Sequence, residues 1–245
     1  MSLLPTALLT LGAALITWLL TGVARRLAVA GAILDRPGPR SAHAQPTPRG
    51  GGLAIAAVVL GAAVLLGIAG FVDAGVVLAL VGGGAIVAVI GWLDDLRGVS
   101  PVVRAVVHCA AAAWAVLWLG GLPRLELGFA DVPFGPAGFV LAVLGIVWSI
   151  NLYNFMDGID GLAAVEAVTV GLAAGTLLFA LGELDLALLG FITAGASAGF
   201  LAWNWPPARI FMGDVGSGLL GFIFPVLALA SENRGSLPIA VWIML

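Results

Sequence analysis

Five aspartates stand out in this chain because their types and spacing suit metal and phosphate chemistry. Asp94 and Asp95 are adjacent, Asp157 and Asp160 lie three residues apart, and Asp214 sits in a Gly-Asp-Val-Gly-Ser turn. Mg²⁺ usually takes one or two carboxylates together with substrate phosphates. Nearby glycines let backbone N–H groups approach an anion closely. These residues predict a site that holds a metal ion and a pyrophosphate.

The elements that must position these aspartates are long apolar segments. The 245 residues are 62% hydrophobic and only 9% charged, with a mean hydropathy of +1.16, whereas a soluble domain carries roughly 25% charge. We therefore expect an all-α polytopic membrane protein with about eight full transmembrane helices and the start of a ninth near Leu237. The predicted spans are 3–24, 52–71, 74–93, 101–119, 136–150, 162–181, 186–203 and 215–230. Spans 136–150 and 215–230 fall short of the ~20 residues of a crossing and must extend into flanking residues.

Four polar strings end or begin these spans, and counting the crossings places all four on one membrane face. The strings are DRPGPRSAHAQPTPRGGG (35–52), GWLDDLRG (91–98), NLYNFMDGIDGL (151–162) and FMGDVGSG (211–218). Carboxylates at membrane depth are costly, so a cluster at one face indicates a functional site.

The arginines predict the orientation of the chain. On the face of the four strings lie Arg25, Arg26, Arg36, Arg40, Arg49, Arg97, Arg104 and Arg209, and on the other face only Arg124 and Arg234. This bias predicts that the strings face the cytoplasm and that the N-terminus is outside. On the outer side, segment 120–135 is expected to form a small hairpin or strand pair.

Composition argues against several other classes of protein. A net charge of −3 gives no reason to expect a nucleic-acid partner. The one cysteine, Cys109, lies in an apolar segment, so neither a disulfide framework nor a thiolate metal site is available. The first apolar run is too long for a signal-peptide core and is read as a retained span.

The individual motifs differ in weight. An adjacent aspartate pair at a helix end is more often solvated charge, and Gly-Asp-Val-Gly-Ser alone is a common turn. Together, on one face of a chain with little other charge, they favour a site. His108 lies one turn from Arg104 and is interpreted as a packed helix residue rather than a ligand, while Glu166 is left open. The aromatic residues near span ends are interpreted as interface anchors: Tyr153, Trp203 and Trp205.

The four strings, in this order, resemble those of the polyprenyl-phosphate N-acetylhexosamine-1-phosphate transferase family, which is related to phospho-N-acetylmuramoyl-pentapeptide transferase. The strings DRPGPRSAHAQPTPRGGG and NWPPARIFMGDVGS resemble the branch that initiates O-antigen and enterobacterial common antigen. The resemblance implies transfer of an N-acetylhexosamine 1-phosphate from a UDP-sugar, such as UDP-GlcNAc, to undecaprenyl phosphate with release of UMP. It also implies the bacterial inner membrane, a role in the lipopolysaccharide or cell-wall pathway, and a possible homodimer.

The same resemblance implies roles in metal binding and catalysis. Asp214 would be the principal ligand of Mg²⁺, or alternatively Mn²⁺, and Asp157 would support the metal and the phosphates together with Asn154. Asp94 and Asp95 would form an acidic pair near the acceptor phosphate, with Asp94 as a candidate base. Phosphoryl transfer of this kind depends mainly on positioning and charge neutralisation.

Five further residues would bind the nucleotide sugar according to the resemblance. Asp160 would accept a hydrogen bond from the uracil, Phe211 would stack on the uracil ring, and Asn204 would lie nearby. Arg49 and His43 match the first-loop region that contacts the nucleotide sugar.

The chain also departs from the family pattern. Residues 1–245 are expected to form a single integral membrane domain that lacks the C-terminal part of the family fold, since no histidine follows His108 and the usual histidine-rich loop is missing. Two alternatives stay open: an inactive or truncated relative that acts as a membrane scaffold, and a transporter. A transporter would place its acids near the midplane in paired repeats, and no repeat is visible here.

Overall fold

The computed structural model describes residues 3–35, 46–126 and 130–245, and these residues are mostly helical. Seven helices are long and apolar enough to cross a membrane, and α2 is a shorter apolar helix of 17 residues. This confirms the all-α polytopic class. The helices are α1 Leu3–Ala30, α2 Gly52–Ile68, α3 Ala74–Leu78, η1 Ala79–Gly83, α4 Gly84–Arg97, α5 Pro101–Leu119, α6 Ala137–Met156, α7 Leu162–Ala180, α8 Leu184–Asn204, α9 Asp214–Asn233 and α10 Ile239–Met244.

The helix boundaries differ from the predicted spans mainly by extension into the polar strings. Helices α6 and α9 reach 20 residues each, because each includes residues of a flanking motif. The third span runs through α3, η1 and α4 without a break, and η1 is a π-helical turn that the sequence did not predict. Gly82 and Gly83 lie in this turn close to α5: a Cβ on Gly83 would approach the carbonyl oxygen of Ala111 to 2.9 Å.

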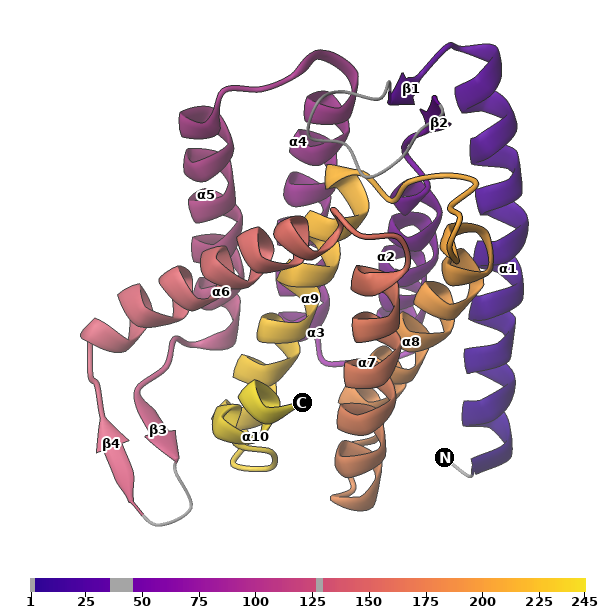
Figure 1. Ribbon diagram of the computed structural model, residues 1–245. Helices are drawn as coiled ribbons and strands as arrows, with labels where there is room; N and C mark the ends of the chain where they lie inside the picture. The colour runs from indigo at the N-terminus through magenta and orange to yellow at the C-terminus, as the bar shows by residue number, and fades with distance from the viewer. Residues whose placement is uncertain (1–2, 36–45, 127–129) are drawn as a thin grey trace.

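Helix α9 forms the centre of the bundle. It packs on α4 and α6. Of its most apolar 18-residue stretch, 89% is buried, against 17% for the same stretch of α1 at the periphery. Figure 1 shows α6 crossing the molecule obliquely, whereas α1 and α5 run along its length. Helix α1 packs on α8 through small residues, since Gly195 and Gly199 lie against the α1 backbone at Thr10 and Ala14.

Two short antiparallel strand pairs mark opposite ends of the bundle (Figure 1). Strand β1 (Leu34–Asp35) pairs with β2 (Thr47–Pro48) at the end where α4 finishes and α9 begins. Strand β3 (Arg124–Glu126) pairs with β4 (Asp131–Pro133) at the other end, as expected for segment 120–135. The β1–β2 pair and the β3–β4 pair therefore lie at opposite ends of the helices.

Candidate active site

Carboxylates from two helices meet at one arginine. Asp94 comes from the last turn of α4 and Asp214 is the first residue of α9. The Nη1 atom of Arg104, in the first turn of α5, donates to Asp94 Oδ2 at 2.6 Å and to Asp214 Oδ2 at 2.8 Å. The other oxygen of Asp94 accepts from the backbone N–H of Val99. Both carboxylates keep some solvent exposure, so a ligand entering from that end of the bundle can reach them.

Asp95 has a different environment from its neighbour. Its side chain has 0% exposure, and its two oxygens accept from the backbone N–H groups of Asp214 (3.1 Å) and Val215 (3.3 Å). It therefore caps the N-terminus of α9, where the helix dipole favours an anion. Asp95 was expected to stand beside the acceptor phosphate; its catalytic role stays a prediction, and this geometry shows a cap instead.

Asp157 follows the last residue of α6 and also contacts the start of α9. Its Oδ2 accepts from the backbone N–H of Gly213 at 3.2 Å. Burial raises the pKa of Asp157 well above its ordinary value, and the negative charges of Asp95 and Asp214 act in the same direction. The adjacent Asn154 receives a long hydrogen bond, 3.4 Å, from the hydroxyl of Ser217. The site thus gathers carboxyl groups from α4, from the end of α6 and from the start of α9.

Glycines allow these helix ends to approach so closely. Gly213 has a φ of 77°, and a Cβ there would lie 2.9 Å from Asp95 Cγ. A Cβ on Gly91 of α4 would lie 2.6 Å from the backbone nitrogen of Val215, where α4 crosses α9. Any larger residue at these two positions would push the carboxylates of α4 away from the N-terminus of α9.

The first motif loop joins the site through backbone pairing. Phe211 donates its N–H to the carbonyl of Pro48 (2.8 Å) and accepts from Gly51 N–H (2.9 Å). Arg49 is thereby held near two acids, with Nη1 3.6 Å from Asp95 Oδ1 and Nη2 3.6 Å from Asp35 Oδ1. Of the two first-loop residues expected to contact the nucleotide sugar, Arg49 reaches the site. His43 lies outside the described residues.

Asp160 and Asn204 organise the loop that leads into α9. Asp160 Oδ2 accepts from Ala208 N–H at 2.9 Å. The buried amide of Asn204 accepts from Gly161 N–H at 2.9 Å and donates to the carbonyl of Ile210 at 3.0 Å. Asn204 thus uses both ends of its amide to tie two loops together, and in this geometry it positions the site rather than presenting a free polar group.

Comparison with known proteins gives the family. The model of the family described as "Glycosyl transferase family 4" matches residues 77–232, which include the aspartates of α4, α6 and α9. The chain belongs to glycosyl transferase family 4.

Several curated proteins are similar to this member of glycosyl transferase family 4. It is 36% identical over 243 residues to the decaprenyl-phosphate N-acetylglucosaminephosphotransferase of Mycolicibacterium smegmatis, a match covering 89% of this chain and 58% of the relative. It is 32% identical over 224 residues to a probable undecaprenyl-phosphate N-acetylglucosaminyl 1-phosphate transferase of Bacillus subtilis, covering 86% and 59%. A Yersinia pestis undecaprenyl-phosphate alpha-N-acetylglucosaminyl 1-phosphate transferase is 32% identical over 235 residues, covering 91% and 63%. The chain thus spans about three fifths of the length of these relatives.

The carboxylates at the start of α9 suit a divalent cation that is shared with a phosphate. Among the residues that the structure describes, no group of three acidic, histidine or cysteine side chains converges as a complete metal cage. Mg²⁺ commonly needs only one or two carboxylates, because phosphates and water supply its other ligands. Asp214 and Asp157 flank Gly213 and carry hard oxygen donors, so the donor set fits Mg²⁺ bound together with a phosphate ligand.

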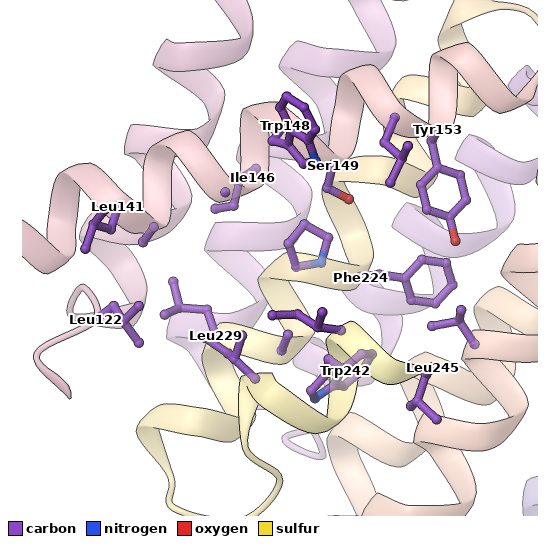
Figure 2. Close-up of a pocket in the computed structure, with 18 of the residues that line it drawn as sticks. Leu122, Leu141, Ile146, Trp148, Ser149, Tyr153, Phe224, Leu229, Trp242 and Leu245 are labelled. Atoms are coloured by element: carbon purple, nitrogen blue, oxygen red, sulfur yellow. The ribbon is translucent and has the colours of Figure 1, made fainter. Parts of the chain in front are cut away.

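An apolar cavity lies between α6, α7, α9 and α10 (Figure 2). Its volume is about 490 Å³, and aliphatic and aromatic side chains line most of it. Tyr153, one residue before Asn154 on α6, lines its wall. Trp242 and Leu245 line it as well (Figure 2). Its α9 wall begins at Phe224, ten residues along the helix from Asp214, and none of the five aspartates lines it.

Sequence reasoning missed one site residue and left another open. Arg104 was counted among the arginines on the face of the strings and interpreted as the neighbour of His108, whereas it bridges two partly exposed carboxylates. The sequence signal for Arg104 was its position in the first turn of a span, on the same membrane face as five aspartates whose charge calls for a cation. Glu166, left open, lines the apolar cavity. His108 is buried, as expected for a packed residue.

Proposed function

We propose that this family member transfers an N-acetylhexosamine 1-phosphate from a UDP-sugar to undecaprenyl phosphate. A phosphate oxygen of the acceptor attacks the phosphorus that bears the sugar, the bond to the other phosphate breaks, and UMP leaves. The observation that carries the proposal is the carboxylate pair Asp94 and Asp214, bridged by Arg104 at the N-terminus of α9. The names of the relatives, which act on decaprenyl or undecaprenyl phosphate, support the same reaction.

The polar end of the site would bind the diphosphate of the donor. Asp214 and Asp157 would hold Mg²⁺, which neutralises charge on the phosphate oxygens when it is bound. Arg104 keeps Asp94 and Asp214 in place and adds a positive charge beside the transferred phosphate. The acceptor phosphate is already ionised at neutral pH, so the contribution of Asp94 is to orient it rather than to remove a proton.

The donor nucleotide would lie over the loop between α8 and α9. Phe211 offers an aromatic face at the edge of the site, and Asp160 fixes the loop through Ala208. Arg49 would pair with a phosphate or sugar group, since its present acidic neighbours lie at 3.6 Å. UDP-GlcNAc is the default donor, and the arginine distribution favours a site that faces the cytoplasm of a bacterial inner membrane.

The isoprenoid chain of the acceptor would occupy the cavity between α6 and α9. Burying apolar chain in an apolar space of about 490 Å³ stabilises the bound acceptor while its phosphate stays at the polar end. A soluble nucleotide and a membrane lipid can therefore meet at one place.

UMP release by the purified 245-residue chain tests the proposal. The assay contains undecaprenyl phosphate, Mg²⁺ and UDP-GlcNAc, with a panel of other UDP-N-acetylhexosamines. We expect Mg²⁺-dependent UMP release that is lost in Asp214→Asn and retained in Asp131→Asn, a matched change in the outer hairpin at a 60% exposed side chain. Activity that persists in Asp214→Asn contradicts the metal assignment. Absence of UMP release with every donor contradicts the proposed reaction for this chain.

A further inference from the structure

Two arginines and two tryptophans meet where α1 lies beside the end of α8, away from the carboxylate cluster. The Nε–H of Arg25 donates to the backbone carbonyl of Arg209 at 3.2 Å. The guanidinium of Arg209 lies over the indole of Trp203, 5.9 Å from the ring centre. Trp203 in turn donates its indole N–H to the carbonyl of Trp18 at 3.0 Å. We call these four residues the arginine–tryptophan patch.

Along α1, the tryptophan of the patch comes first and the arginine follows toward the end of the helix, which is the order expected at a membrane interface. Trp18, Gly22 and Arg25 follow one another on the helix face that meets α8, and seven residues span about 10 Å. The rings of Trp18 and Trp203 lie 6.2 Å apart, and a Cβ on Gly22 would touch the Trp203 ring at 3.0 Å. Amphipathic aromatic rings favour the headgroup boundary. Arginines just beyond them lie at the depth of lipid phosphates.

The positive charge of the patch is not neutralised by the protein. Within residues 3–35, 46–126 and 130–245, neither Arg25 nor Arg209 has a carboxylate at ion-pair distance. Apart from the bond from Arg25 Nε, the N–H groups of both guanidiniums have no hydrogen-bond acceptor among these residues. Stacking on Trp203 limits the motion of Arg209, so the donors are pre-organised. Such an arrangement is complementary to a phosphate group.

We propose that the arginine–tryptophan patch binds the phosphate headgroup of an anionic phospholipid, in the leaflet on the side of the candidate active site. Helix α1 is peripheral and largely exposed, and Trp18 keeps 44% of its surface, so acyl chains can lie against it. The charge of the patch selects an anionic lipid over a zwitterionic one. The phosphate could also come from the nucleotide donor, because Ala208, next to Arg209, is hydrogen-bonded to Asp160, the residue expected to bind the uracil. The experiment below separates the lipid from the nucleotide.

Native mass spectrometry of the purified chain with equimolar phosphatidylglycerol and phosphatidylcholine of matched acyl chains tests this proposal. We expect preferential binding of phosphatidylglycerol. Removing each arginine should weaken that binding about fivefold, so Arg25→Gln with Arg209→Gln should lose about 25-fold. Arg209→Lys, which keeps the charge but not the planar stacking, should fall between the wild type and Arg209→Gln. Phosphatidylcholine binding should stay unchanged throughout.

The matched control is Arg97→Gln, because Arg97 is an exposed arginine at the same end of the bundle, without a tryptophan contact. Equal loss in Arg97→Gln would show a general charge effect and overturn the proposal. An unchanged lipid preference in the double variant would also overturn it. If that variant instead raises the KM for the UDP-sugar while lipid binding holds, the patch belongs to the nucleotide. Thermal unfolding in detergent checks that the variants are folded.

Discussion

Replacing Asp95 distinguishes a structural cap from a catalytic acid. In the structure the side chain is fully buried and accepts from two backbone N–H groups at the start of α9. Asp95→Ala leaves both donors without a partner. Loss of a helix N-cap costs about 0.5–2 kcal/mol, and hydrogen bonds to a charged group are worth about 1.5–3 kcal/mol each. Because these terms overlap, we expect a loss of about 3 kcal/mol in the free energy of unfolding.

The more informative change is Asp95→Asn. The amide oxygen can still accept from the Asp214 N–H, so the expected loss is about 1 kcal/mol. A change of 1 kcal/mol moves the unfolding midpoint of a chain of this size by about 2–4 °C. Asp95→Ala should therefore lower the midpoint by about 6–12 °C and Asp95→Asn by about 2–4 °C. Asp95→Asn should keep much of its UMP release per folded molecule.

The assay pairs thermal unfolding in detergent with UMP release, and Asp94→Asn is the control one residue away. Asp94 lies partly exposed beside Arg104, so its change should reduce turnover more than stability. Our reasoning is refuted if Asp95→Asn unfolds at the wild-type temperature and is as inactive as Asp214→Asn. That outcome would make Asp95 a catalytic acid, as the family resemblance implied.

Three other changes follow from the same geometry. Arg104→Gln leaves two neighbouring carboxylates without their cation, so UMP release should fall at least about tenfold, a barrier increase of about 1.4 kcal/mol, with partial recovery in Arg104→Lys. Gly213→Ala should lower the unfolding midpoint more than Gly98→Ala: both have positive φ, 77° and 69°, but only a Cβ at position 213 meets another side chain. An equal effect in the two would show that backbone strain alone acts. Ala142→Trp, which fills part of the apolar cavity, should raise the KM for undecaprenyl phosphate about tenfold in steady-state assays without changing that for the UDP-sugar.

Much of the fold was predictable because lipid exposure imposes a simple pattern on the chain. Apolar runs of about 20 residues indicate transmembrane helices. The predicted span 101–119 matches α5 at both ends. The short runs were expected to extend, and α6 and α9 do so. The π-helical turn η1 and the oblique course of α6 follow from contacts between helices far apart in sequence. No local pattern carries that information.

The site was predictable as a collection of residues but not as a set of roles. The motifs placed the aspartates on one face, and the structure brings three helix ends together there. Sequence could not separate Asp94 from Asp95, because adjacent residues on a helix point about 100° apart and the crossing partner decides which is buried. That crossing occurs at Gly91, where α9 approaches the α4 backbone. Arg104 was missed for the same reason.

The contrast between α9 and α6 suits the proposed use of one bundle by a soluble donor and a lipid acceptor. Helix α9 is the most buried span, and its first residue is Asp214, so the carboxylate is fixed by the protein core. Pre-organised charge of this kind is what phosphoryl transfer requires. Only 22% of the most apolar 18-residue stretch of α6 is buried, and α6 borders the apolar cavity. A lipid can therefore enter beside α6 without disturbing the helix that holds the acids.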